Sequence, residues 1–171
     1  TMSSSWGVYS GYELFEHRAV REGSEEYLDS EKYELRPRDF EAAVAENRSL
    51  EPFLRRLNEI RRAHPALRQL RGLSVHWSDD DAILVYSKHI DGTLTDTGVS
   101  DTIIVVANVD PRSVRQTTVH LDSTVWGVPR GEEFEVEDLI TGAVWTWNQD
   151  AFVRLDAFAE PVHILHVKER S

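Results

Sequence analysis

Residues 49–67, SLEPFLRRLNEIRRAHPAL, decide how this chain is organised, because the sequences before and after them follow different patterns. Apolar side chains recur here at spacings of three and four, which places them on one face of a helix. Ser49 is a suitable N-cap, and Pro52 stands in the first turn, where a missing N–H is tolerated. Pro65 pushes His64 out of helical geometry, so the pattern predicts a helix that stops there. The apolar face consists of Leu50, Phe53, Leu54, Leu57, Ile60 and Ala63.

Residues 6–15, WGVYSGYELF, form an apolar and aromatic segment that contains two glycines. Nearly continuous hydrophobicity indicates a strand buried on both faces, as in a parallel sheet, and glycine marks a bend or a close backbone approach. A parallel strand requires parallel neighbours, yet the rest of the chain contains no further strand-then-helix units. The sequence therefore predicts a barrel-type strand whose sheet is missing from this chain.

Residues 16–47 are rich in charge and poor in aliphatic side chains. We expect a long surface excursion with a short helix over residues 39–45. Two interpretations stay open on composition. A long ordered loop after a barrel strand is where enzymes place binding residues, whereas a charged segment of this kind is also typical of a flexible linker.

Short apolar or alternating segments follow the helix at hairpin spacing, with no helix between them. This pattern predicts an antiparallel β-sandwich. A turn over residues 78–81 separates the first two predicted strands, and a Gly-, Thr- and Asp-rich loop covers residues 90–101. The predicted strands are residues 73–77, 82–89, 102–108, 116–121, 134–139, 143–147, 152–155 and 162–167.

Composition describes an acidic protein and excludes several partners. The 171 residues carry 19 Lys and Arg against 30 Asp and Glu, a net charge of −11, which argues against nucleic acid and anionic membrane as partners. No apolar run approaches the roughly 18 residues of a membrane span. The absence of cysteine excludes disulfides and favours a cytoplasmic setting. The start has no signal-peptide pattern, and Thr1 before Met2 suggests a piece of a longer protein or a tag remnant.

The residues alone indicate little chemistry. Seven histidines are scattered, and His163 and His166, three apart on a predicted strand, point to opposite faces, so we expect no metal site. The acidic residues of the loop could contain a paired acid and base, although solvated charge is the commoner role. No phosphate-binding loop and no nucleophile motif is present, and we expect no cofactor.

Three tryptophans of the predicted sheet region have two possible roles. Trp126, Trp145 and Trp147 could form a platform on which sugar rings stack, and Trp145 and Trp147 share a face by the period of two. Packing in the core is the commoner role for such residues. Both interpretations remain open at this stage.

Three motifs together resemble the C-terminal end of enzymes of the α-amylase clan, glycoside hydrolase family 13. Residues 8–13, VYSGYE, match the aromatic-rich eighth barrel strand that ends in Gly-x-Glu. Residues 58–67, NEIRRAHPAL, match the end of the last barrel helix, and residues 75–88, VHWSDDDAILVYSK, match the first strands of the all-β domain that follows. The resemblance implies a mainly β chain: an antiparallel β-sandwich preceded by the last strand, loop and helix of a (β/α)8 barrel.

Within that clan, residues 6–40, 138–156 and 163–167 are similar to the family of actinobacterial α-1,4-glucan:maltose-1-phosphate maltosyltransferases. The resemblance implies that Lys32 and Tyr33 bind the distal glucose of the maltosyl unit. An ammonium group offers three donors to sugar hydroxyls, and a phenol adds a polar tip to an apolar ring. The implied partners are α-maltose 1-phosphate, an α-1,4-glucan acceptor and a second copy of the chain in a homodimer.

The implied reaction is a retaining transfer through a glycosyl-enzyme, with two carboxyl groups about 5 Å apart. The nucleophile, the acid/base and the third carboxylate of the family precede the eighth strand, so this chain contributes no catalytic residue. Glu13 matches an acid that supports the barrel wall.

We therefore expect residues 1–70 to be the end of the barrel and residues 71–171 to be the sandwich, inactive alone. The alternatives are a free-standing carbohydrate-binding or protein-interaction sandwich and, less favoured, the end of another hydrolase or isomerase of the clan.

Overall fold

The computed structural model describes residues 1–28 and 35–168. These divide into two compact units, one formed by Trp6–Glu59 and the other by Thr1–Ser5 together with Ile60–Ser171. The boundary falls within the long helix α2, Glu51–Ala63. None of the helices in the described ranges has the length and apolarity to cross a bilayer.

The smaller unit is built from short helices and turns. A 3₁₀ helix, η1 (Tyr12–Leu14), precedes α1 (Phe40–Ala45) and the first part of α2. Asp39 caps α1 by accepting the N–H of Ala42 at 2.8 Å, which confirms the predicted short helix. The helix ends because Asn47 adopts a left-handed conformation (φ 55°) and Arg48 N–H returns to the carbonyl of Ala43 at 2.8 Å.

The segment 6–15 does not form a strand in this chain, contrary to the expectation from its hydrophobicity. It contains η1 instead, with Gly11 at φ 99° and Phe15 at φ 59° on its two sides. The physical reason is that a strand needs neighbours to satisfy its backbone groups, and here local turn bonds such as Tyr12 N–H to Tyr9 O at 3.0 Å satisfy them instead. Its assignment to a barrel strand stays a prediction about a longer protein.

Helix α2 follows the sequence closely. Ser49 Oγ accepts the N–H of Glu51 at 3.1 Å at its start. At its end, His64 is extended (φ −108°, ψ 109°) before Pro65, which confirms the predicted stop. The chain continues as a single 3₁₀ turn, η2 (Pro65–Arg68), whose Ala66 and Leu67 are fully buried against β3 and β4.

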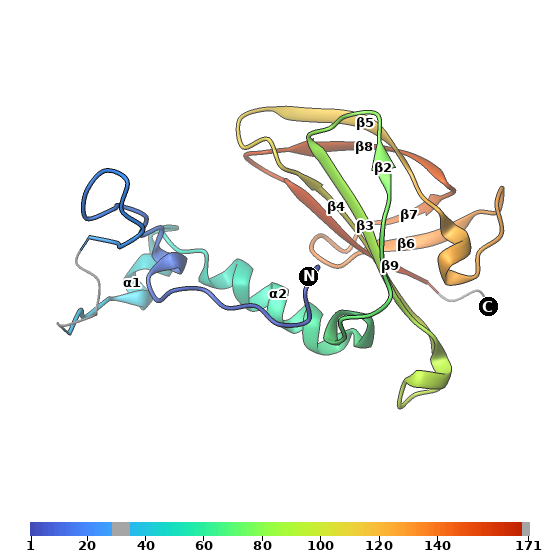
Figure 1. Ribbon diagram of the computed structural model, residues 1–171, viewed down its shortest axis with the longest axis horizontal. Coiled ribbons are helices and arrows are strands. Elements are labelled where there is room, and N and C mark those ends of the chain that lie inside the picture. The colour runs from blue at the N-terminus through green and yellow to red at the C-terminus, as the bar shows by residue number, and fades with distance from the viewer. Residues whose placement is uncertain (29–34, 169–171) are drawn as a thin grey trace. The chain divides into compact units, whose positions relative to one another are not determined.

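The larger unit is an antiparallel β-sandwich, as the sequence predicts (Figure 1). One sheet has the strand order β1-β3-β4-β9-β6-β7 and the other has the order β2-β5-β8. The connections include the 3₁₀ turns η3 (Gly92–Leu94) and η4 (Ser123–Trp126). The strands are β1 (Leu73–Val75), β2 (Trp77–Ser78), β3 (Ile83–Ile90), β4 (Asp101–Asn108), β5 (Val114–His120), β6 (Phe134–Asp138), β7 (Val144–Trp147), β8 (Asp150–Asp156) and β9 (Val162–Val167).

One predicted strand, residues 73–77, divides between the two sheets. Val75 pairs with Tyr86 of β3, whereas Trp77 pairs with His120 of β5. His76 lies between them and still donates its N–H to Val85 O at 2.9 Å. The chain therefore changes sheet within one residue. As a result, the side chain of Trp77 lies on the outer face of the three-stranded sheet.

The core lies between the two sheets and is made of aliphatic residues from alternate positions, joined by Trp126 and Phe134. Part of the opposite face of the six-stranded sheet is also buried, where Ala66 and Leu67 of η2 pack against β3 and β4. Lys88 lies on this second face, fully buried, and its Nζ donates to the carbonyl of Gln69. Burial, with the charge of Arg61 nearby, lowers the pKa of Lys88.

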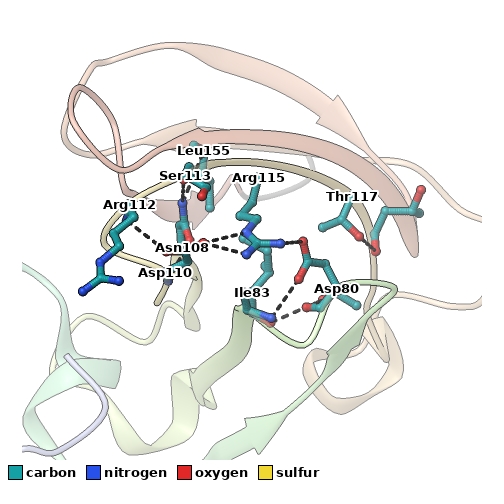
Figure 2. Close-up of polar contacts among 12 residues, drawn as sticks. Asp80, Ile83, Asn108, Asp110, Arg112, Ser113, Arg115, Thr117 and Leu155 are labelled. Carbon is teal, nitrogen blue, oxygen red and sulfur yellow. Dashed lines mark hydrogen bonds and ion pairs between the residues drawn. The ribbon is translucent and has the colours of Figure 1, made fainter.

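A polar network closes one end of the sandwich (Figure 2). Asn108 donates through Nδ2 to the carbonyls of Ser113 (2.8 Å) and Leu155 (3.4 Å), while its Oδ1 accepts the N–H of Asp110 at 2.9 Å. Arg115 lies between Asp110 (2.6 Å) and Asp80 (3.5 Å). The network ties the β4–β5 connection to β8 and to the turn before β3.

Candidate functional site

The predicted sugar-binding residues Lys32 and Tyr33 lie outside the described residues. The segments that lead to and from residues 29–34 are described, and they show how the loop is anchored. On the leading side, Ala19 and Tyr27 form an antiparallel bridge, with Val20 N–H to Glu26 O at 2.8 Å and Leu28 N–H to Arg18 O at 2.7 Å. The segment that leads into residues 29–34 is therefore a short hydrogen-bonded ladder.

Glu16 joins the two ends of this loop. Arg38 binds both carboxylate oxygens of Glu16, at 3.0 and 3.1 Å, and Arg36 lies 3.4 Å from the first of them. The hydrogen bond from Arg38 lowers the pKa of Glu16, against a smaller opposing effect of burial. A bidentate arginine–carboxylate pair is geometrically specific, so the entry and exit of the loop are fixed to each other.

A pocket of about 260 Å³ lies beside this anchor, lined by Phe15, Glu16, His17, Arg18, Tyr27, Leu28 and Arg36. Phe15 is an exposed aromatic residue in the left-handed backbone region, an uncommon conformation for a bulky side chain. Backbone strain of this kind is found at binding sites more often than elsewhere. Gly11 permits the close approach, since a Cβ there would lie 2.2 Å from Glu16 Oε2.

The three tryptophans considered from the sequence do not form a platform. Trp126 is 8% exposed and packs edge-on against Phe134 in the core. Trp147 packs against the same core, and Trp145 makes an edge contact with His163 at 5.4 Å between ring centroids. Core packing is therefore the role of Trp126 and Trp147.

A different aromatic surface lies on the outer face of the three-stranded sheet. Trp77 is 64% exposed, and its ring stacks on His120 at 4.2 Å between centroids and 24° between planes. His120 contacts Asp150 at 2.6 Å and Asp79 at 3.1 Å. The hydrogen bond to Asp150 is the largest cause of the raised pKa of His120. A cleft of about 410 Å³ runs beside these residues, lined also by Arg130 and Gln149.

Phe152 extends this surface. It is 65% exposed and pairs with Thr118 on the row next to the His120–Asp150 pair. The sequence did contain a signal for it. In DAFVRLD, Ala151, Val153 and Leu155 occupy the buried phase, so Phe152 shares the outward phase with Asp150 and Arg154. The sequence contains no such signal for Trp77, because the change of sheet at His76 reverses the face on which the Trp77 side chain lies.

The histidines group in a way that sequence spacing does not show. His163 faces Asp138 at 2.7 Å on one side of the six-stranded sheet. His166 lies on the other side, near His64 and Asp101, which confirms that the two histidines of β9 point to opposite faces. Burial, and then the charge of His64, lowers the pKa of His166.

Comparison with known proteins gives consistent matches. Residues 75–167 match the family described as "GLGE, C-terminal". Proteins named alpha-1,4-glucan:maltose-1-phosphate maltosyltransferase are similar over nearly the whole chain: that of Mycolicibacterium smegmatis is 55% identical over 167 residues (98% of this chain), that of Corynebacterium glutamicum 53% over 169 residues (99%), and that of Mycobacterium tuberculosis H37Rv 49% over 167 residues (98%). The chain spans about a quarter of the length of these relatives, 23% of the first and 24% of the second.

Proposed function

The chain belongs to the family described as GLGE, C-terminal, and from this membership we propose that it is the C-terminal part of a maltosyltransferase of the α-amylase clan. The whole enzyme transfers maltosyl units from α-maltose 1-phosphate to α-1,4-glucans by a retaining mechanism. The observation that carries the proposal is the similarity to enzymes of this name over 98% of the chain. The catalytic carboxylates belong to the preceding barrel, so the chain alone transfers no maltosyl units.

In this proposal residues 1–70 are the end of the catalytic barrel and residues 71–171 are the sandwich. The division is supported by the family match over residues 75–167 and by the succession of strands, with only the short 3₁₀ turns η3 and η4 between them, in the described chain after Gly72. Residues 60–70 belong to the barrel part in this proposal, yet they lie in the larger compact unit, because η2 packs on β3 and β4.

Lys32 and Tyr33 bind the sugar in this proposal, and the loop anchor supports that role. Glu16, Arg36 and Arg38 join the two described segments that precede and follow residues 29–34 in the chain. Joining the two flanking segments reduces the entropy that the chain between them loses when it binds a substrate. The neighbouring pocket at Phe15 and Tyr27 offers aromatic faces to a second sugar ring.

The test uses the M. smegmatis transferase carrying this chain in place of its own matching segment. The exchanged enzyme should release phosphate from α-maltose 1-phosphate in the presence of glycogen, and the 171-residue chain alone should not. In the exchanged enzyme, Lys32→Ala should raise KM for the donor about 10-fold or more, since a hydrogen bond to a charged group contributes about 1.5–3 kcal/mol. Arg48→Ala, an exposed residue of the same unit paired with Glu46, is the matched control.

Turnover by the chain alone would contradict the proposal that the catalytic carboxylates lie outside this chain. An unchanged KM in Lys32→Ala would contradict the proposed role of Lys32 in sugar binding. The enzyme is further proposed to be cytoplasmic and homodimeric, without a nucleic acid or membrane partner. The absence of cysteine and the charge of −11 support the setting and the excluded partners. Light scattering of the exchanged enzyme should give twice the protomer mass.

A second function is favoured by the exposed aromatic surface. Trp77 and Phe152 are exposed aromatic residues on the face that carries His120 and Asp150, and the cleft beside Trp77 is lined also by Gln149. The polar groups of His120, Asp150 and Gln149 suit sugar hydroxyls. We propose that this face holds glucan chains at the sandwich. Migration of the chain in gels containing glycogen should be retarded, and Trp77→Ala should abolish the retardation. Trp145→Ala is the control. The proposal would be overturned if the parent chain were not retarded by glycogen, or if only Trp145→Ala, and not Trp77→Ala, lost the retardation.

A further inference from the structure

Two imidazoles and one carboxylate meet on the outer face of the six-stranded sheet. His64 follows helix α2, Asp101 begins β4, and His166 belongs to β9. Ile103 pairs with His166, so Asp101, two residues earlier on β4, is a diagonal neighbour of His166 on the same face. The extended conformation of His64 brings its ring over this pair. Residues that are separated by 37 and 65 positions in the sequence thus converge.

The three ligand atoms are close to one another. His64 Nδ1 lies 2.9 Å from Asp101 Oδ1, and His166 Nε2 lies 3.5 Å from the same oxygen. The imidazole rings are 4.8 Å apart between centroids and tilted by 55°. All three ligand atoms lie within 4.8 Å of one another. Bond lengths of about 2.0–2.2 Å around a tetrahedral ion put ligand atoms about 3.4 Å apart, so the ring of atoms needs only small movements to hold one.

We propose that His64, Asp101 and His166 form a binding site for a divalent transition-metal ion, Zn²⁺ first among them. Two imidazoles with one carboxylate are a ligand set that suits zinc and its neighbours in the first transition row rather than Mg²⁺ or Ca²⁺. His64 releases Nδ1 for the ion by carrying its proton on Nε2. A water molecule completes the tetrahedron.

The surroundings support the site. Asp101 keeps its second oxygen for the N–H of Ala66 at 2.9 Å, and this bond orients the carboxylate as an outer-shell partner does at metal sites. The side chains of His64 and His166 are 14% and 25% exposed, so an ion can reach them. The nearby ammonium of Lys168 is neutralised by its contact with Glu137, which lies opposite His166 on β6.

A second cluster, Asp138 with His163 and Glu160, is the internal comparison. There one nitrogen, His163 Nδ1, faces both carboxylates, at 2.7 and 3.8 Å, and Asp138 is fully buried with an oxygen committed to Ile140 N–H at 2.8 Å. A single imidazole makes it the weaker ligand set for a transition-metal ion. It provides a variant of the same residue type on the same strand, with His163 more buried (8% exposed) than His166 (25%).

The experiment is a titration of the 171-residue chain with Co²⁺, followed by its visible absorption, and with Zn²⁺ in competition with a chromogenic chelator. We expect one equivalent to bind, to raise Tm, and to shift the imidazole NMR signals of two histidines. His166→Gln should weaken binding at least 10-fold, whereas His163→Gln should bind as the parent chain does. Near-UV circular dichroism of each variant verifies that the sandwich is intact.

Two results would overturn the proposal. One is a parent chain that takes up no ion beyond the level of a His166→Gln variant shown to be folded. The other is binding that is lost in His163→Gln and kept in His166→Gln, which would place the ion at the second cluster.

Discussion

His64 Nδ1 lies 2.9 Å from Asp101 Oδ1, and the other oxygen of this carboxylate accepts the N–H of Ala66 at 2.9 Å. The buried side chain of Asp101 thus holds both His64, the extended residue after α2, and η2, the 3₁₀ turn that follows. Burial disfavours the charged form of Asp101, but the hydrogen bonds from His64 and Ala66 outweigh it, and the net effect lowers the pKa. The contact holds the residues His64 to Ala66 against β4.

Asp101→Asn should destabilise the sandwich by about 2 kcal/mol, because the amide brings an N–H toward donors that now face a carboxylate. Urea unfolding with chelator present, followed by tryptophan fluorescence, measures the change. Asp96→Asn, in the exposed part of the loop before β4, is the control and should stay within about 0.5 kcal/mol. Equal effects of the two substitutions would show that the carboxylate does not hold the helix end.

Gly72→Ala should be more harmful than Gly142→Ala. Both glycines have positive φ, 73° and 78°, so alanine costs about 1–2 kcal/mol at either position. At Gly72 an added Cβ would also lie 2.0 Å from the carbonyl oxygen of His89, whereas nothing lies within 4 Å at Gly142. We expect a loss of about 3 kcal/mol or more for the first variant. Thermal unfolding of both variants ranks them, and a similar Tm would contradict the close contact.

Asn108→Asp should destabilise the sandwich, because Nδ2 of Asn108 donates to two carbonyl oxygens and a carboxylate would repel both. The expected loss is about 2–3 kcal/mol. Asn148→Asp is the matched control: its Oδ1 accepts the N–H of Asp150 at 2.9 Å, a bond that a carboxylate also makes. Urea midpoints that fall equally would show that the Asn108 amide is not the donor in Figure 2.

Trp126→Ala and Trp77→Ala should differ in their effect on the free energy of unfolding. Trp126 is in the core, so its removal should cost about 3–5 kcal/mol. Trp77 is largely exposed, and its removal should cost less than about 1 kcal/mol. Calorimetric unfolding measures both. A large loss of stability in Trp77→Ala would mean that its stacking on His120 serves the fold.

Stability should fall as the pH drops below about 6.5, the ordinary pKa of histidine. Burial lowers the pKa of His76, His89 and His166, so the unfolded chain binds protons in this range that the folded chain does not, and protonation favours unfolding. His120 has a raised pKa and acts in the opposite direction, since its contribution is complete below about 6.5 and is lost as the pH rises.

Urea midpoints at pH 7.5, 6.5 and 5.5 test this sign, with chelator present. His120→Gln should show a steeper loss toward pH 5.5 than the parent chain, because it lacks the one group of the four that opposes the trend. A midpoint that rises toward pH 5.5 would show that the three partly buried histidines do not control the dependence.

Much of the fold follows from local sequence pattern. The helix begins near Ser49 and ends before Pro65 because capping and the proline clash are local effects. The strands follow the alternation of buried and exposed residues, as in Ala151, Val153 and Leu155 of β8. The family resemblance likewise rests on contiguous motifs, and the later match over residues 75–167 agrees with it.

Other features depend on partners distant in the chain. Hydrophobicity predicted a strand at residues 6–15, yet a strand forms only where another strand offers its backbone, and η1 forms instead. Lys88 has the sequence of an exposed strand residue, but Gln69 and the chain around it bury it completely. Neither outcome is encoded in the neighbouring residues.

The sequence by itself determined helix α2, the sandwich class and the family, because propensity, periodicity and motif are properties of contiguous residues. Only the tertiary structure decided the change of sheet at His76, the exposure of Trp77 and the meeting of His64, Asp101 and His166. Strand register and packing set these features, and both are fixed by contacts between residues far apart in the chain.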